Sequence, residues 1–279
     1  KPGKDILGKM LIESSRMGNL DNVKLLIDNG VDVNAKNDVG LTAYQISMIR
    51  GNRAMQYLKE HGAGTDIPMP SFDILVDNIF KSAQTGTTSG VSILVSKNGE
   101  IIYEKGFGYA DIGNKVPVTP ETKFRIGSIT KQFIAASVLK LQEEGKINVQ
   151  DKLSKFIPDF PRGDEVTIHH LLTHTSGIHS YTNRPDFLNY VTLPVNPAAL
   201  VDTIKAYPYD FNPGDNYMYN NSGFFLLGYI IEKISGKSLA DYLQETLFSP
   251  LGMNNTGIYE TTLLLDHEAY GYSYENGKI

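Results

Sequence analysis

Apolar positions after Lys131 recur at the spacing of one helix face, and this pattern continues to Gly145. Gly127 interrupts the chain just before this stretch. Glycine is also the typical residue directly beyond a helix C-terminus, which suits Gly145. The pattern therefore predicts a helix that begins near Ser128 and ends just before Gly145.

A shorter periodicity predicts a β-hairpin earlier in the chain. Two runs rich in β-forming residues, 91–96 and 101–103, flank Asn98 and Gly99. Asn-Gly is the preferred pair for a two-residue type I′ turn between antiparallel strands. We therefore expect the two runs to pair with each other.

The first part of the chain contains an internal repeat. Residues 16–19 (Arg-Met-Gly-Asn) recur as residues 49–52 (Ile-Arg-Gly-Asn), so that Gly18 and Gly51 are 33 residues apart. This repeat resembles the ankyrin repeat, whose period is also about 33 residues. The resemblance implies a small all-α module over residues 1–66, with a protein as its binding partner. An unrelated four-helix segment is the alternative.

The second copy of the repeat departs from the ankyrin pattern at two positions, and a linker follows it. Ala43 stands where that family prefers proline, and Gln45 stands where it prefers histidine. A stretch containing Pro and Gly then predicts a linker at 67–71 and a second domain over 72–279. The helical pattern after the linker predicts an apolar face made by Ile74, Leu75, Ile79 and Phe80.

The bulk composition narrows the class of protein. Of 279 residues, 41% are hydrophobic and 20% are charged, and the net charge is −5, as in an ordinary globular protein. The lack of a basic run gives no support to nucleic-acid binding, and no apolar run reaches the ~20 residues of a membrane span. Because there is no cysteine, thiol catalysis, disulfides and thiolate metal sites are excluded. The chain opens Lys-Pro-Gly-Lys, so we expect a processed or trimmed product.

Ser128 and Lys131 are the first candidates for chemistry. They are three residues apart at the start of the predicted helix, where residues i and i+3 are neighbours. The unpaired N–H groups and the positive dipole end of a helix N-terminus also favour an oxyanion. By itself, a Ser-x-x-Lys pattern is usually a helix cap beside a solvated lysine. Other motifs have to decide between these interpretations.

Motifs farther along the chain indicate a family. Tyr219 and Asn221 form a Tyr-x-Asn triplet. Further segments occur in the family's order, at 170–177, 213–221, 235–238 and 250–253. With Ser128-x-x-Lys131, they give residues 72–279 a resemblance to the serine β-lactamase and penicillin-binding-protein superfamily, in its class C-like branch. The resemblance implies an α+β, β-lactamase/transpeptidase-like fold, in which helices flank an antiparallel sheet.

The same resemblance implies roles for four residues. Ser128 is the nucleophile, and Lys131 and Tyr219 form the base that activates it, because a free serine hydroxyl is a poor nucleophile. Asn221 hydrogen-bonds Lys131 and the substrate, and the Ser128 N–H supplies half of an oxyanion hole. The implied reaction is acyl transfer through an acyl-enzyme, without cofactor or metal. The substrate is an amide or ester: a D-alanyl peptide, a β-lactam or a simple ester, with a peptidase or esterase role favoured over antibiotic resistance.

One motif of the superfamily is missing. A Lys/His-x-Gly tripeptide is expected on a late strand, and none follows Asn221. We therefore expect a hydrolase domain that is incomplete at its C-terminus and is completed by a separate fragment or a second chain. Relatives with peptidoglycan-like substrates favour an extracytoplasmic location. The alternative function is a binding protein that uses the ankyrin-like module and has a silent hydrolase domain.

Three neighbouring histidines raise a metal hypothesis. His170 and His174 are four residues apart and follow His169, as ligands on one helix face would. Leu171 follows His170, so the pattern is not H-E-x-x-H, and no acidic third ligand is evident. We expect packing or hydrogen-bonding roles for these side chains and no metal site.

Overall fold

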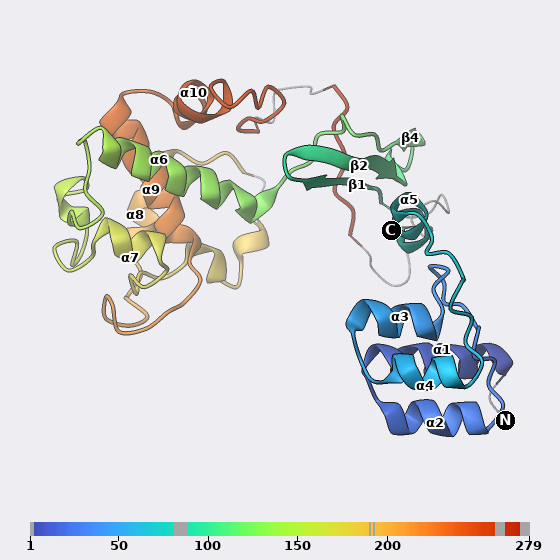
Figure 1. Cartoon of the computed structure of the whole chain (residues 1–279). Coiled ribbons are helices and arrows are strands. Elements are labelled where there is room, and N and C mark those ends of the chain that lie inside the picture. The colour runs from blue at the N-terminus through green and yellow to red at the C-terminus, as the bar shows by residue number, and fades with distance from the viewer. Residues whose placement is uncertain (1–2, 81–88, 190, 192, 260–265, 274–279) are drawn as a thin grey trace. The chain divides into compact units, whose positions relative to one another are not determined.

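The computed structural model describes residues 3–80, 89–189, 191, 193–259 and 266–273. It divides into two compact units, one formed by Lys1–Phe124 with Leu265–Ile279 and the other by Arg125–Leu264. Helices and short antiparallel strand pairs occur together, which confirms the predicted α+β class (Figure 1). The predicted linker at 67–71 lies within the first unit, and the predicted domain boundaries stay a prediction.

Four helices open the first unit. They are α1 (Lys4–Arg16), α2 (Leu20–Asp28), α3 (Ala43–Arg50) and α4 (Ala54–Glu60). α1 packs against α2 and α3, and α3 packs against α4. The repeat glycines Gly18 and Gly51 have φ values of 69° and 62° at the turns between the paired helices. The helices share a buried core that includes Leu11, Ile12, Val23, Leu26, Ile46 and Leu58.

Gln45, which departs from the ankyrin pattern, fixes the start of α3. Its side-chain oxygen accepts the Thr42 N–H over 2.9 Å, and Thr42 Oγ1 accepts the Gln45 N–H over 3.2 Å. This reciprocal pair is a capping box. Gln45 Nε2 also donates to the carbonyls of Ile67 and Pro68. One buried glutamine therefore caps a helix and fastens the segment that the sequence marks as a linker.

The predicted hairpin is confirmed. β1 (Val91–Lys97) pairs antiparallel with β2 (Glu100–Phe107). Asn98 and Gly99 have φ values of 53° and 85°, and a type I′ turn requires a positive φ at both positions. A second antiparallel pair follows, β3 (Tyr109–Asp111) with β4 (Val116–Pro117).

The helix α5 (Phe72–Ile79) contacts the hairpin through a face that differs from the predicted one. Its Val76 is buried against aromatic residues of β2. Ile74 and Ile79 of the predicted apolar face are 53% and 57% exposed, so they do not join this core. Ile74 is two residues from Val76 and therefore points about 200° away around the helix, while Ile79 is the last helical residue. The other two residues of the predicted face do pack against buried residues. Leu75 contacts the core of the first four helices, and Phe80 contacts the cluster that contains Val76.

The second unit is built around the helix α9. Its α-helices are α6 (Thr130–Glu143), α7 (Ile168–Leu172), α8 (Pro197–Lys205), α9 (Asn221–Ser235) and α10 (Leu239–Leu243). The other four helices all pack against α9, which lies among them in Figure 1. The core-facing residues of α9 are Leu226, Leu227, Ile230 and Ile231, all 0% exposed. Short turns connect the helices: η2 (Gly127–Ile129), η3 (Leu153–Lys155), η4 (Tyr181–Asn183), η5 (Phe187–Asn189) and the π-helical η6 (Gln244–Phe248).

The helix predicted between Ser128 and Gly145 is present as α6, with a different first turn. Ser128 lies in the 3₁₀ turn η2, directly before the α-helix. At the other end, Gly145 has a φ of 70° and donates its N–H to the carbonyl of Gln142. The Lys146 N–H donates to the carbonyl of Leu141, which completes a Schellman cap.

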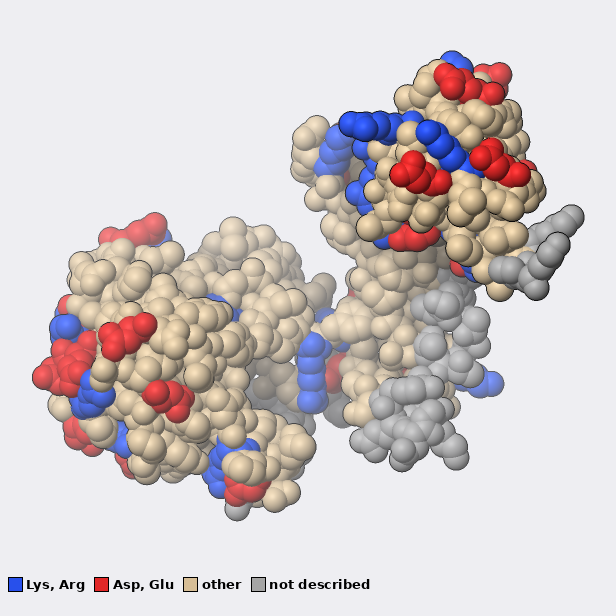
Figure 2. Space-filling view, turned by 90° about the horizontal axis from the view of Figure 1, so that it is seen from below, with Lys and Arg blue, Asp and Glu red and all other residues tan. Residues whose placement is uncertain are grey.

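The surface carries charges of both signs. Lys and Arg lie interspersed with Asp and Glu on the face shown in Figure 2. Within the described parts of the chain, no helix is long and apolar enough to cross a membrane.

Candidate active site

Ser128 and Lys131 are brought together by the turn that precedes α6. Gly127 has a φ of 50°, and the 3₁₀ turn that it opens runs straight into the α-helix. Lys131 is the second residue of α6, and its Nζ donates to Ser128 Oγ over 3.1 Å. The hydroxyl and the amine are therefore neighbours, as the spacing predicts.

Tyr219 and Asn221 come from the start of α9 and meet the same pair. They flank Asn220, whose side-chain oxygen caps α9 by accepting the Gly223 N–H over 2.7 Å. The hydroxyls of Ser128 and Tyr219 are hydrogen-bonded, with 2.6 Å between Oγ and Oη. Lys131 Nζ donates to Asn221 Oδ1 over 2.7 Å. All four predicted site residues thus converge within the second unit, and their chemical roles stay predictions.

The environment of Tyr219 favours its phenolate form. The Lys131 ammonium beside it and the hydrogen bond from Ser128 hold the pKa of Tyr219 below its usual value. Lys131 Nζ lies 4.7 Å from the centroid of the Tyr219 ring. Tyr219 is 45% exposed, so a small molecule can reach the Ser128–Tyr219 pair from solvent.

His174 holds the backbone on both sides of Tyr219. Its carbonyl accepts the Met218 N–H over 3.0 Å, and its Nδ1 accepts the Asn220 N–H over 3.1 Å. The rings of His174 and Tyr219 are 4.8 Å apart. Burial and, second, the charge of Lys131 lower the pKa of His174. The neutral imidazole is the form that can accept the hydrogen bond at Nδ1.

The hydrogen-bonding roles expected for His170 and His174 are confirmed. His170 Nδ1 accepts the Thr167 N–H over 3.3 Å, and Thr167 Oγ1 caps α7 by accepting the His170 N–H. In the residues that the structure describes, no group of three or more His, Cys, Asp or Glu side chains could hold a metal ion.

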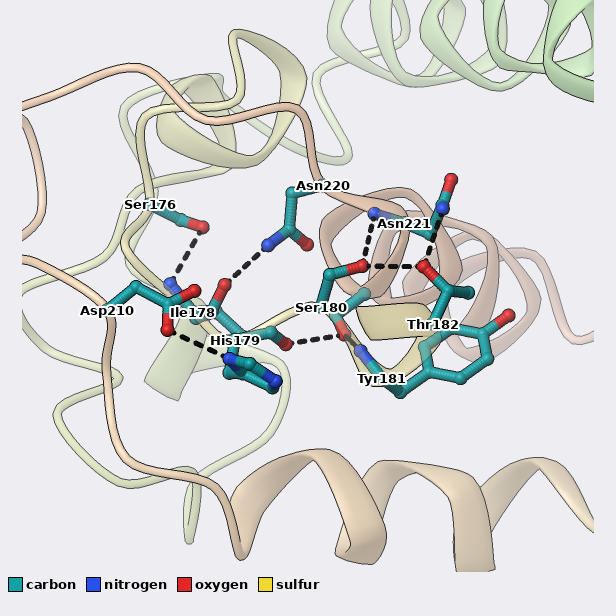
Figure 3. Close-up of polar contacts among 10 residues, drawn as sticks. Ser176, Ile178, His179, Ser180, Tyr181, Thr182, Asp210, Asn220 and Asn221 are labelled. Carbon is teal, nitrogen blue, oxygen red and sulfur yellow. Dashed lines mark hydrogen bonds and ion pairs between the residues drawn. The ribbon is translucent and has the colours of Figure 1, made fainter. Parts of the chain in front are cut away.

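Two hydroxyls that the sequence did not indicate contact Asn221. Thr182 Oγ1 accepts a hydrogen bond from Asn221 Nδ2 over 2.9 Å, and Ser180 Oγ accepts the Asn221 N–H over 3.2 Å. Figure 3 shows both hydroxyls beside the start of α9. The segment 170–177, which supports the family resemblance, ends before these residues. Their contacts depend on how the following loop folds, for which the sequence carries no local signal.

The comparisons with known proteins agree with this arrangement. The sequence model of the family described as Beta-lactamase matches residues 76–279. The chain therefore belongs to this family of serine β-lactamases and penicillin-binding proteins. The predicted superfamily and the β-lactamase/transpeptidase-like fold are confirmed.

Three relatives illustrate the likeness. Penicillin-binding protein 4* of Bacillus subtilis (strain 168) is 36% identical over 192 residues, which are 66% of this chain and 42% of that protein. The octameric penicillin-binding protein homologue from Pyrococcus abyssi is 35% identical, with a TM-score of 0.66 over 75% of this chain and 50% of that chain. The D-amino acid amidase from Ochrobactrum anthropi SV3, complexed with D-phenylalanine, is 29% identical, with a TM-score of 0.60 over 71% of this chain and 58% of that chain. The chain spans less than half the length of the curated relatives that it matches.

Proposed function

We propose that this chain is a serine hydrolase that cleaves an amide or ester through an acyl-enzyme on Ser128. The observation that carries the proposal is the 2.6 Å contact between Ser128 Oγ and Tyr219 Oη, with Lys131 Nζ 3.1 Å from the same Oγ. A serine hydroxyl needs a neighbouring base before it can act as a nucleophile. Two such groups converge on Ser128, and membership of the family supports the same chemistry.

Acylation begins when the coupled Lys131–Tyr219 group takes the Ser128 proton. Oγ then bonds to the carbonyl carbon of the substrate, and the carbonyl electron pair moves onto its oxygen. In this proposal the Ser128 N–H, which belongs to the turn directly before α6, donates to that oxyanion. Collapse of the tetrahedral intermediate breaks the bond to the leaving amine or alcohol, which receives the proton from the same group.

Deacylation repeats these steps with water as the nucleophile. Water loses its proton to the Lys131–Tyr219 group, attacks the acyl carbon and releases the acid and the Ser128 hydroxyl. Asn221 contributes by keeping Lys131 in place through the 2.7 Å hydrogen bond. In this proposal its amide also donates a hydrogen bond to the substrate.

The substrate class that we favour is an amide or ester of a D-amino acid. Support comes from the likeness to penicillin-binding proteins and to a D-amino acid amidase that binds D-phenylalanine. A simple ester or a β-lactam would use the same nucleophile.

Turnover of matched substrates tests the proposal. We expect the chain to hydrolyse D-phenylalanine amide faster than the L-enantiomer and to lose this activity in Ser128→Ala. Ser96→Ala, the same change at an exposed serine of β1, serves as the control and should keep it. Hydrolysis that survives in Ser128→Ala would contradict the assignment of the nucleophile. Equal rates for both enantiomers would contradict only the substrate class.

We further infer that residues 1–66 are an ankyrin-like module. Its support is the 33-residue spacing of Gly18 and Gly51 and the pairing of α1 with α2 and of α3 with α4. Binding of a protein partner by this module, with a silent hydrolase region, is the alternative function.

A further inference from the structure

The side chain of Asn221 is held at both ends of its amide. Its Oδ1 accepts from Lys131 Nζ over 2.7 Å, and its Nδ2 donates to Thr182 Oγ1 over 2.9 Å. The Thr182 hydroxyl is in turn 3.0 Å from Ser180 Oγ. Because an amide nitrogen carries two hydrogens, the contact with Thr182 uses one and leaves the other for a substrate.

Thr182 belongs to a loop that is fastened to the start of α9. The loop accepts a hydrogen bond from Asn220 Nδ2 at the carbonyl of Ile178. Ser222 Oγ accepts the N–H of Tyr181 over 2.9 Å and donates to the carbonyl of His179 over 2.7 Å. Figure 3 shows these contacts side by side, with the Thr182 hydroxyl directed at the Asn221 amide. Thr182 therefore approaches Asn221 from a segment that three hydrogen bonds tie to the start of α9.

The orientation of the Asn221 amide decides which of its two ends meets Lys131. A lysine ammonium only donates hydrogen bonds, so it selects the oxygen end of the Asn221 amide. A neutral amine also accepts, and an amide without a second partner can then turn its nitrogen toward Lys131. The hydrogen bond to Thr182 opposes that rotation if the Thr182 hydroxyl donates its own proton to Ser180 Oγ, 3.0 Å away, because it can then only accept from Asn221.

We propose that Thr182 is a positioning residue that keeps the oxygen of the Asn221 amide on Lys131 and its remaining N–H toward the substrate. The expected effect of Thr182 on the rate of reaction at Ser128 rests on the proposed function, in which Ser128 is the nucleophile. Thr182 itself touches neither Ser128 nor Lys131 among the contacts of the described residues, so it acts through Asn221 alone.

Two variants separate this role from a general structural one. Thr182→Val keeps the shape and removes the acceptor, whereas Thr182→Ser keeps the acceptor. We expect the rate constant for labelling of Ser128 by a fluorophosphonate to fall on the order of tenfold in Thr182→Val, because a misplaced group near the reaction is costly, and to stay near the parent in Thr182→Ser. Thr203→Val on α8 removes another half-buried hydroxyl, which donates to the carbonyl of Ala199, and should leave the rate unchanged.

A second readout does not depend on labelling. In the resting 279-residue protein, ¹⁵N NMR follows hydrogen exchange of the Asn221 side-chain amide, identified by its loss in Asn221→Ala. We expect faster exchange in Thr182→Val and parental exchange in Thr182→Ser. Parental exchange in Thr182→Val, or a Thr182→Ser variant as slow in labelling as Thr182→Val, would overturn the proposal. If the parent itself is not labelled at Ser128, the proposed function fails, and the exchange comparison still decides whether Thr182 holds the amide.

Discussion

Tyr219 depends on its neighbours for any role as a base. A free phenol has a pKa of about 10 and is mostly protonated at neutral pH. Lys131 and the hydrogen bond from Ser128 lower the pKa of Tyr219, so the phenolate forms at a less alkaline pH than in a free tyrosine. The same 2.6 Å contact places that phenolate oxygen next to the proton that it has to accept.

At this residue scale, we predict that Tyr219→Phe and Lys131→Ala each slow fluorophosphonate labelling of Ser128. The expected loss is about 100- to 10,000-fold, the range for removal of a general base. Tyr217→Phe and Lys140→Ala are matched controls, since Tyr217 is the exposed neighbouring tyrosine and Lys140 is an exposed lysine on the same helix. Labelling within about twofold of the parent in Tyr219→Phe and Lys131→Ala would contradict the assigned base.

The histidine beside Tyr219 gives a prediction on pH. Burial and the Lys131 charge lower the pKa of His174 relative to the unfolded chain, where it is about 6.5. Above that pH, the side chain is neutral in both states. As the pH falls through about 6.5, the unfolded chain binds the proton first, so the free energy of unfolding decreases. The decrease ends once the pH is below the lower pKa that His174 has in the folded protein. We expect the protein to be less stable at pH 5 than at pH 7.

His174→Asn isolates this contribution. Asparagine offers an acceptor near the position of Nδ1, does not titrate, and tolerates the left-handed conformation that His174 adopts at φ 60°. The decrease in the free energy of unfolding between pH 7 and pH 5, measured by urea denaturation, should be smaller in this variant than in the parent. His267→Asn makes the same change at an exposed histidine with φ 61° and controls for the backbone. If the free energy of unfolding decreases between pH 7 and pH 5 by the same amount in His174→Asn as in the parent, His174 does not cause the decrease.

At the scale of elements, the start of α9 depends on the buried cap Asn220. This side chain is 4% exposed, accepts the Gly223 N–H and donates to the carbonyl of Ile178. Asn220→Ala should cost about 1 kcal/mol for the cap and about 1–3 kcal/mol more for the buried carbonyl left without a partner. Asn196→Ala, at the exposed cap of α8, should cost only the first amount. Equal losses in urea denaturation would contradict the second role of Asn220.

Local signals explain which elements the sequence could predict. The Asn98-Gly99 turn and the Gly145 cap each follow from a backbone conformation that glycine or asparagine adopts more readily than other residues. The sequence did not indicate which side of α5 is buried, because a short helix with apolar residues on several sides gives no single direction of burial. Its buried residue is chosen by packing against β2, which is a tertiary effect.

At the scale of the whole molecule, all four site residues lie in the unit formed by Arg125–Leu264. We predict that a covalent adduct on Ser128 increases hydrogen-exchange protection at Ser128–Lys131 and at the start of α9, because a ligand stabilises the elements that hold it. The amides of α1–α4 should not change. Hydrogen exchange followed by mass spectrometry, with Ser128→Ala exposed to the same reagent, checks this. Increased protection that is confined to α1–α4 would contradict this prediction, because the adduct would then not stabilise the elements that carry the four site residues.

The candidate site shows where sequence reasoning ends. Ser128 and Tyr219 are 91 residues apart, and only the family resemblance connects them before the fold is known. The resemblance therefore predicted the four residues and the hydrogen bond between Asn221 and Lys131, but not the contacts that the surrounding loop makes with them. Thr182 contacts the Asn221 amide and His174 accepts the Asn220 N–H because of how the loop before α9 folds, which no spacing along the chain encodes.

The most direct test of the central claim is the mass of the protein after reaction with a fluorophosphonate. In this reaction Ser128 Oγ displaces fluoride from phosphorus and keeps the phosphonyl group. We predict one added phosphonyl mass, located by peptide mapping on Ser128 and absent from Ser128→Ala. An adduct on another residue, or the same adduct in Ser128→Ala, would contradict the account that Ser128 is the nucleophile of this chain.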